Sequence, residues 1–476
     1  MKNLKFLLVL SFVLLNASVF RAKNKSTLIY SPQTRVVQYK LSVQPQTQTA
    51  FVEGLITGVK AAEVKGWESF IAGLPDIIPS KITDTPEGVR FSYTVMESNK
   101  PEIASHEASI DENHLRAWGW NLFTTPVSEQ PITKAELTIS LPKGWQIVTS
   151  LGVGKKRLKM SVDDLRGLAL ALGDFRAVSF KAAGVPVYVA IREKDPTREA
   201  TVQALKALVS NSVSYFGSKP SRNVMFAIDL LGNKKSYAPG NNTTSRLHSS
   251  TILLHKDNAD PRRMGFAGTF AHEYTHSWIP HAFGASNTTI KNLGAFFTEG
   301  FTNYFGYRLA RLSGLHDDAT LAKALSYYYV EYAYISGVGR KGNEGALPYS
   351  HRMMAACILD MELLLSTSGK SGLKEVMQQL LRQHAHTDGL TKDELVAALT
   401  ETGGGKFAAL YERLADDKIT LDIPALLQNA GIQVKRIEDT KQIFNNYTSG
   451  SASLVVFTPN NAEEKESLNW FLSPLR

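Results

Sequence analysis

The sequence predicts a multidomain α+β protein, in which a β-sandwich precedes a mixed α+β part and then a helical part. Its 476 residues exceed what one hydrophobic core usually organises. Short strand patterns separated by turn signals fill the first third of the chain, whereas helical periodicity prevails beyond about residue 290. We therefore expect domain boundaries near residues 179 and 313.

The first 22 residues have the character of a signal peptide. Lys2 and Lys5 form a basic region, and a predominantly apolar run follows from Phe6 to Phe20. That run is too short to cross a bilayer comfortably but suits the hydrophobic part of a signal peptide. The sequence thus predicts an exported protein, periplasmic or secreted, with residues 1–22 removed. An uncleaved anchor is the alternative; without it we expect no stable membrane insertion.

Residues 27–179 carry the pattern of a β-sandwich. Runs rich in β-formers occupy residues 35–43, 88–95 and 135–141, with Pro-Glu-Gly and Pro-Lys-Gly turns beside them. The last run alternates apolar and polar side chains, as a half-buried strand does. Regular short strands without intervening helices favour two packed sheets.

The mixed part and the helical part follow at residues 180–313 and 314–435. Strand patterns at 185–191, 224–231 and 251–255 flank a helical pattern at 197–216. Glycines then interrupt a nearly continuous series of helical patterns. The only cysteine, Cys357, lies in an apolar run and reads as a core residue. The tail at 436–476 has no clear pattern.

Charge and composition exclude some partners. The chain is 43% hydrophobic and 20% charged, as globular proteins are, and its net charge of +9 comes without any long block of like charges. Such a diffuse positive balance does not argue for a nucleic-acid partner.

Residues 272–276 read His-Glu-Tyr-Thr-His within a helical pattern. Because His272 and His276 are four residues apart, their imidazoles lie one turn apart on one helix face and are able to bind one metal ion. Glu273 is close enough to act as a base on a water that the metal activates.

A third ligand is expected on the following helix. Glu299 is the only carboxylate in the apolar and aromatic segment 293–305, where its burial needs a cationic partner. A pair of helices would bring Glu299 to face His272 and His276. Asn303, one turn further on, is either a residue that orients a ligand or a surface residue.

These segments resemble the gluzincin metallopeptidases, and most closely the glycyl aminopeptidase family. The resemblance rests on His-Glu-Tyr-Thr-His-Ser-Trp at 272–278 and Thr-Glu-Gly-Phe-Thr-Asn-Tyr at 298–304. It implies an N-terminal β-sandwich, a thermolysin-like α+β catalytic domain and a C-terminal helical domain. Members often carry a C-terminal PDZ domain, which we expect this chain to lack, since about 40 residues follow Gly431.

The resemblance also implies roles for individual residues. His272, His276 and Glu299 would bind one Zn²⁺, and Glu273 would be the general base. Tyr349 would stabilise the oxyanion, since it matches the tyrosine that opens the Tyr-x-Lys-Gly segment of the family. At this segment the chain departs from the family, because His351 and Arg352 replace the lysine and the glycine.

A second departure concerns the anchor for the substrate's free amine. The family has an acidic residue ahead of the zinc helix, whereas this chain has no Asp or Glu between Asp229 and Asp257 and instead carries Arg246. A desolvated ammonium group needs an anionic partner. Strict cleavage from the amino end is therefore in doubt.

The sequence predicts an exported zinc metallopeptidase that acts on peptides through a zinc-activated water, aminopeptidase-like in its family resemblance. Two alternatives stay open. One is an endopeptidase or oligopeptidase without free-amine specificity, and the other is a non-catalytic binding protein that retains zinc.

Overall fold

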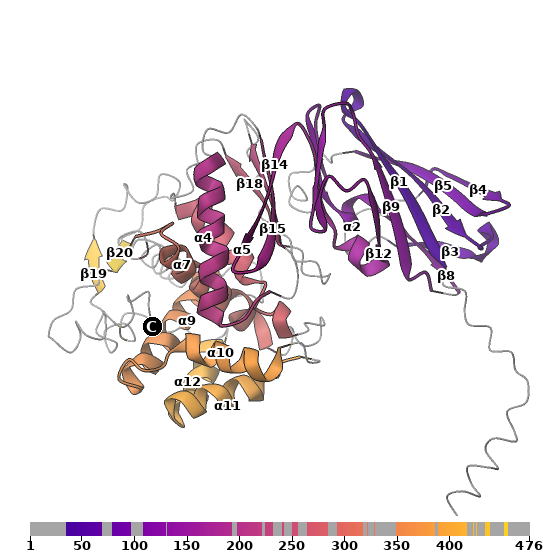
Figure 1. Cartoon of the computed structure of the whole chain (residues 1–476). Coiled ribbons are helices and arrows are strands. Elements are labelled where there is room, and N and C mark those ends of the chain that lie inside the picture. Colours follow the sequence, from indigo (N-terminus) through magenta and orange to yellow (C-terminus); the bar gives the residue numbers. More distant parts are fainter. Residues whose placement is uncertain are drawn as a thin grey trace, which may run out of the picture.

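The computed structural model describes most of the chain from residue 35 onward. The described residues are 35–68, 79–96, 108–129, 131–192, 198–220, 224–231, 240–241, 250–255, 264–283, 293–317, 349–385, 389–416, 434–437 and 452–455, with single residues at 321, 328, 422 and 425. Figure 1 shows a β-rich part on one side and an α+β part on the other. The predicted signal peptide at 1–22 lies outside the described residues.

A six-stranded sheet forms the outer layer of the β-rich part. In order its strands are β12 (Arg157–Ser161), β9 (Lys134–Ser140), β1 (Val36–Gln44), β2 (Thr49–Thr57), β5 (Gly88–Met96) and β4 (Lys81–Thr85). Neighbouring strands are antiparallel except β1 and β9, which are parallel. Along β1 every second residue is buried, so one face of this sheet meets the core and the other meets solvent.

A five-stranded sheet faces it across a common core. In order its strands are β11 (Gly152–Val153), β10 (Gln146–Thr149), β13 (Ala169–Gly173), β7 (His114–Trp118) and β6 (Ser109–Ile110). Smaller elements are η1 (Pro45–Thr47), η2 (Ala61–Glu63), the pair β3 (Val64–Glu68) and β8 (Thr125–Ser128), α2 (Gly119–Leu122) and α3 (Val162–Arg166). Leu41 and Val52 from the first sheet share a core with Leu115 from the second.

A third sheet begins the α+β part and packs on the free face of the second sheet. In order its strands are β14 (Phe175–Ala182), β15 (Val185–Arg192), β16 (Val224–Leu231), β18 (Ser250–His255) and β17 (Gly240–Asn241). Trp118 and Ala171 of the second sheet share a hydrophobic cluster with Ala190 and Met225 of the third. Strand β14 spans the predicted boundary at residue 179.

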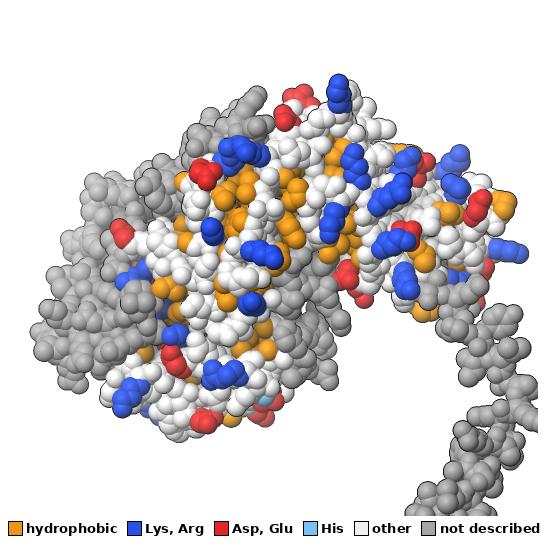
Figure 2. Space-filling view, in the orientation of Figure 1, with side chains coloured by type: hydrophobic (Ala, Val, Ile, Leu, Met, Phe, Trp, Pro, Cys, Tyr) orange, Lys and Arg blue, Asp and Glu red, His pale blue; other side chains and the backbone are white. Residues whose placement is uncertain are grey.

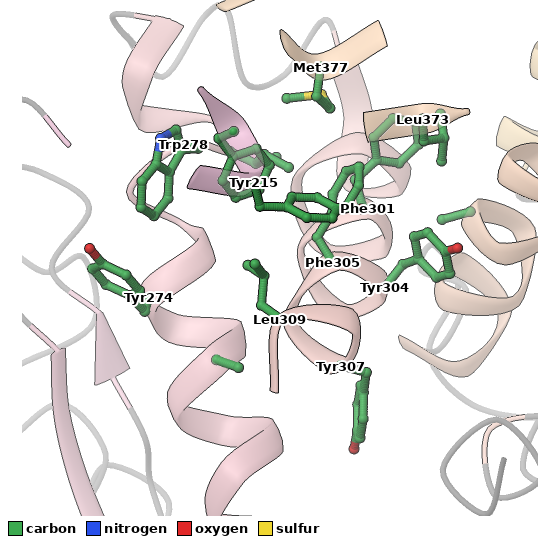
Figure 3. Packing of buried hydrophobic residues seen from close by; sticks show 14 of the residues in the cluster. Tyr215, Tyr274, Trp278, Phe301, Tyr304, Phe305, Tyr307, Leu309, Leu373 and Met377 are labelled. Atoms are coloured by element: carbon green, nitrogen blue, oxygen red, sulfur yellow. The ribbon is translucent and has the colours of Figure 1, made fainter. Parts of the chain in front are cut away.

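Helices cover the third sheet and continue into the rest of the chain. They are α4 (Arg198–Phe216), α5 (Met264–Thr275), η4 (His281–Phe283), η5 (Phe296–Phe301), α7 (Thr302–Leu312), α9 (Tyr349–Ser366), α10 (Leu373–His384), α11 (Lys392–Gly403) and α12 (Lys406–Ala415). A single core joins the sheet to α9–α12. In Figure 3, Trp278 next to α5, Phe301 of η5 and Phe305 of α7 belong to this core. Cys357 is fully buried in α9, as predicted.

The prediction of a mixed α+β fold is confirmed. The predicted domain boundaries stay predictions. In the tail, β19 (Val434–Ile437) and β20 (Ala452–Val455) form a two-stranded antiparallel sheet. Within the described part of the chain, no helix has the length and apolar character needed to span a membrane.

Candidate metal centre

Helix α5 presents both histidines on one side. Its apolar residues Phe270, Ala271 and Tyr274 are buried against the third sheet and α7, which leaves His272 and Glu273 on another face. His276 follows the last helical residue, but its backbone N–H still donates to the His272 carbonyl at 3.3 Å. The two imidazole rings therefore lie in contact, with their centroids 4.7 Å apart.

Glu299 reaches both imidazoles from η5. One of its carboxylate oxygens, Oε2, lies 3.6 Å from His272 Nε2 and 3.9 Å from His276 Nε2. Four ligands about 2.0–2.1 Å from a tetrahedral ion are separated by roughly 3.3 Å. The two distances from the Glu299 oxygen are therefore close to the spacing between ligands of a zinc ion. Atoms of His272, Glu273 and His276 also lie within 4.8 Å of one another, which brings a second carboxylate to the same place.

Element η5 is a π-helical turn rather than part of a regular α-helix. Thr302, the first residue of α7, donates its hydroxyl proton to the Thr298 carbonyl at 2.6 Å. Gly300 lies against α9, where an added Cβ would come within 2.6 Å of the Arg352 carbonyl oxygen. The glycine after Glu299 is thus required by a close backbone contact, and π-helical turns are frequent at functional sites.

Helices α5 and α7 approach each other through two glycines. A Cβ on Gly306 would lie 2.9 Å from both Cα and N of His272, and one on Gly268 would lie 3.1 Å from the Tyr307 ring. At Gly306 the backbone of His272 leaves no room for a methyl group, whereas at Gly268 the Tyr307 ring would have to shift by a few tenths of an ångström. The close approach brings the start of α7, directly after Glu299, next to the histidines.

Two neighbours orient the imidazoles. His276 Nδ1 lies 2.8 Å from the Ile279 carbonyl oxygen, which accepts a hydrogen bond from Nδ1–H and leaves Nε2 available as a metal donor. The side chain of Asn303 lies beside His272 and raises the pKa of its imidazole, which favours the protonated form. Asn303 is 6% exposed, so of the two predicted alternatives the surface role is wrong.

Burial sets the protonation of the site. Desolvation, followed by repulsion from His276, holds the pKa of His272 well below its usual range. Desolvation also raises the pKa of Glu273 to about 7; His276 lowers it, and the Glu299 carboxylate raises it further. A neutral imidazole is the form that binds a metal ion, and a carboxylate with a pKa near neutrality is suited to proton transfer.

Two other predicted residues lie partly or wholly outside the described part of the chain. Tyr349 is the first residue of α9, but its side chain lies outside the described part, so the oxyanion role stays a prediction. Arg246 also lies outside the described residues. His351 and Arg352, which replace the family's lysine and glycine, are both buried in α9.

A buried polar network next to the site was missed by sequence reasoning. Tyr304 donates its hydroxyl proton to Asp360 Oδ2 and accepts a hydrogen bond from Arg308 Nη1 at 3.2 Å. The Leu373 N–H donates to Asp360 Oδ1 at 2.6 Å. The network ties α7 to α9 and α10. Its only sequence signal is the four-residue spacing of Tyr304 and Arg308, because Asp360 is remote along the chain.

Comparison with known proteins agrees with this geometry. Residues 265–342 match the M61 glycyl aminopeptidase family. The predicted family resemblance is confirmed. The enzyme class that this match indicates is a zinc metallopeptidase, a hydrolase, as the sequence predicts. A comparison with curated proteins finds no match.

Solved structures show a similar fold over most of the chain. An aminopeptidase N family protein from Idiomarina loihiensis has a TM-score of 0.66 at 18% identity, covering 87% of this chain and 82% of that one. A mutant M1 zinc metallopeptidase from Deinococcus radiodurans, bound to a Tyr-Ser-Ala substrate, has a TM-score of 0.50 at 12% identity, covering 82% of this chain and 95% of that one. At these identities the likeness concerns the fold alone.

Proposed function

We propose that this protein is an exported zinc metallopeptidase that hydrolyses peptide bonds in an aminopeptidase-like manner. The observation that carries the proposal is the position of Glu299 Oε2, within 3.6–3.9 Å of Nε2 of both His272 and His276. Three such donors with one adjacent carboxylate leave a coordination position open, as catalytic zinc sites do and structural ones do not.

His272, His276 and Glu299 would hold one Zn²⁺ ion. When bound, zinc lowers the pKa of a water molecule and polarises the carbonyl group of the scissile bond. The low pKa of His272 keeps its imidazole neutral, so that ring offers Nε2 without first losing a proton. In His276 the hydrogen bond between Nδ1 and the Ile279 carbonyl oxygen leaves Nε2 as the nitrogen that would face the metal.

Glu273 would move the proton. Its carboxylate would accept a proton from the attacking water and deliver it to the leaving amine. The side chain is 7% exposed, so few solvent molecules compete for that proton. Tyr349 would donate a hydrogen bond to the developing oxyanion, a contribution of a few kcal/mol. The proposal for Tyr349 is supported by the contact of α9 with η5 at Gly300 and Arg352.

Replacing the general base tests the reaction. Glu273→Gln keeps the shape of the side chain and removes the proton acceptor, so the variant should bind zinc at one equivalent and lose at least a hundredfold in kcat. Glu401→Gln, on the exposed side of α11, serves as the matched control and should retain full turnover. If the Glu273→Gln variant turned over substrate at the wild-type rate, Glu273 would not be the general base.

Specificity for the amino end is tested with a pair of peptides. The absence of any acidic residue between Asp229 and Asp257 favours an endopeptidase or oligopeptidase as the second candidate. The same peptide is offered with a free and with an acetylated amino terminus. Cleavage of the free form alone supports an aminopeptidase, whereas equal cleavage of both supports the second candidate.

The alternative of a non-catalytic binding protein has its own measurement. A zinc-loaded protein that cleaves no bond of a broad peptide library would support the non-catalytic binding protein instead.

Export is supported by the basic and apolar character of residues 1–22. Amino-terminal sequencing of the protein recovered outside the cytoplasm tests it, and a first residue near Ala22 or Lys23 is the expected result.

A further inference from the structure

Arg352 is a buried arginine in the first turn of α9. Lys and Arg side chains usually lie at the surface of a protein, and Figure 2 shows many of them there in one view. Arg352, by contrast, is only 7% exposed. A guanidinium group stays protonated throughout the physiological pH range, so this burial places a permanent positive charge inside the protein. Such a charge costs free energy unless an anion neutralises it.

The described part of the protein supplies no such anion. The Arg352 side chain forms no ion pair or hydrogen bond with any residue there, and its Nε atom is sealed from solvent without a partner. Arg308 is also buried, but it donates to the Tyr304 hydroxyl at 3.2 Å and lies 3.8 Å from Asp360. The Nη1 and Nη2 atoms of Arg352 are not sealed in this way. A small anionic group from outside is therefore able to reach them.

The start of α9 attracts an anion as well. This helix spans Tyr349–Ser366, and its first turn contains no acidic residue. The N-terminal end of a helix carries a partial positive charge, which favours anions and disfavours a cation such as Arg352. Because helical side chains lean toward the N-terminus, the guanidinium and the helix end act on the same place. A carboxylate fits best, since it accepts two parallel hydrogen bonds from a guanidinium group.

Arg352 belongs to the surroundings of the candidate metal centre. A Cβ on Gly300 would lie 2.6 Å from the Arg352 carbonyl oxygen and 3.0 Å from its Cβ. The side chain therefore leaves α9 against the residue that follows Glu299. With neutral imidazoles, the carboxylates of Glu273 and Glu299 would offset the two charges of a zinc ion. The charge of Arg352 is not needed for that balance and is left for a ligand of the same site.

We propose that Arg352 binds a carboxylate group of the peptide substrate, and that the protein prefers peptides with a carboxylate close to the scissile bond. This preference rests on the proposed peptidase function. The carboxylate belongs either to the C-terminus of a short peptide or to an Asp or Glu side chain, and both present the same chemistry. Arg352 stands where the resembled family has glycine, so this anchor is a feature of the present chain.

Binding to an inactive variant tests the preference without relying on turnover. Zinc-loaded Glu273→Gln protein is titrated calorimetrically with three matched pairs: Ala-Ala-Ala and its C-terminal amide, the amides of Ala-Asp-Ala and Ala-Asn-Ala, and the amides of Asp-Ala-Ala and Asn-Ala-Ala. In at least one pair the carboxylate should improve affinity about a hundredfold, as for a buried charge pair. The first pair identifies a terminal carboxylate and the other two a side chain. Equal affinities within all three pairs would overturn the inference.

Variants of Arg352 show whether its guanidinium is responsible. Added to Glu273→Gln, Arg352→Gln should abolish the hundredfold preference and leave the affinity for the neutral peptide unchanged. Arg352→Lys keeps the charge but not the two parallel donors, so it should retain part of the preference. Arg382→Gln, an exposed cation of α10, is the matched control and should retain all of it. Equal losses in the two Gln variants would show a long-range charge effect and overturn the inference.

Thermal unfolding gives a readout without any ligand. Because the Arg352 charge has no partner in the protein, Arg352→Gln should not lower the Tm of the peptide-free protein. A fall as large as that of Arg308→Ala would show an internal partner for the guanidinium and overturn the inference. A carboxylate preference in binding, together with no cleavage of any peptide by the wild-type protein, would instead overturn the proposed function alone.

Discussion

Gly306 lies directly against His272, with room between the two backbones for a hydrogen atom but not for a methyl group. A Cβ at position 306 would be 2.9 Å from both Cα and N of the histidine. The two residues belong to α7 and α5, the helices that bring the two halves of the candidate metal centre together. The glycine therefore sets the distance between the Glu299 carboxylate and the two imidazoles.

Substituting Gly306 should weaken metal binding before it unfolds the protein. In Gly306→Ala the added methyl group would push α7 away from α5, costing about 1–3 kcal/mol of stability and lowering zinc affinity at least tenfold. Competition with a chromogenic chelator measures the affinity. Gly405→Ala is the control, because a Cβ there meets no atom within 4 Å. Unchanged zinc affinity in Gly306→Ala would show that the helix contact does not position the ligands.

Removing the Asn303 side chain should loosen His272 without removing a ligand. Partners that orient a metal-binding histidine typically contribute 10–100-fold to metal affinity, so Asn303→Ala should lose about that much. The exposed Asn113→Ala provides the control. Cobalt substitution adds a spectroscopic readout, since a reoriented imidazole changes the visible absorption bands. Identical spectra and affinities would contradict the role of Asn303.

Glu273 should make the metal-free protein less stable as the pH rises. Its pKa is raised from 4.5 to about 7 in the folded protein, so the folded state holds this proton more tightly than the unfolded state. The resulting stabilisation is complete below pH 4.5 and is lost by pH values above 7, and it amounts to at most about 3 kcal/mol. Denaturant unfolding of the metal-free protein at pH 5 and pH 8 measures it.

The Glu273→Gln variant isolates this effect from other titrations. Glutamine cannot ionise, so the difference in unfolding free energy between variant and wild type should favour the variant more at pH 8 than at pH 5. A difference that does not change with pH would mean that Glu273 titrates normally in the folded protein.

The buried network around Asp360 should be needed for stability. In Arg308→Ala the Asp360 carboxylate loses the guanidinium 3.8 Å away, which costs about 3–5 kcal/mol for a buried charge. Thermal unfolding measures the loss, with the exposed Arg382→Ala as the control. A fall in Tm no larger than that of the control would show that Tyr304 and the Leu373 N–H suffice for Asp360.

The sequence predicted the helix that carries the His-Glu-Tyr-Thr-His segment because helical spacing is a local property. His272, Glu273 and His276 lie together for the same reason that residues four apart always share a helix face. The approach of Glu299 was also predictable, since a lone carboxylate in an apolar helix needs a cationic partner. Strands β15, β16 and β18 begin and end within one residue of the predicted ranges.

Long-range contacts escaped sequence reasoning. The sequence around Gly306 does not indicate its contact with His272, because the two residues are 34 positions apart. Glycine also has no side chain whose polarity would show which face of the helix is buried. The parallel pairing of β1 with β9 is equally remote. In the sequence, Asp360 is a single acidic residue in an apolar run. Its hydrogen-bond partners lie on α7 and α10, which are remote along the chain. Such partners are chosen by packing, which a single sequence does not display.

The π-helical turn at Phe296–Phe301 determines the direction in which the side chains of the following helix, α7, point around the helix axis. A regular α-helix through the same residues would need one residue fewer, and each residue removed rotates the remainder by roughly 100°. With Glu299 directed at the histidines, such a deletion would turn Arg308 away from Asp360; with Arg308 in place, it would turn Glu299 away from the imidazoles. The extra residue lets one helical segment serve two partners in different directions. Among related sequences, a one-residue gap between Ala295 and Thr302 would therefore mark the loss of one of these two contacts.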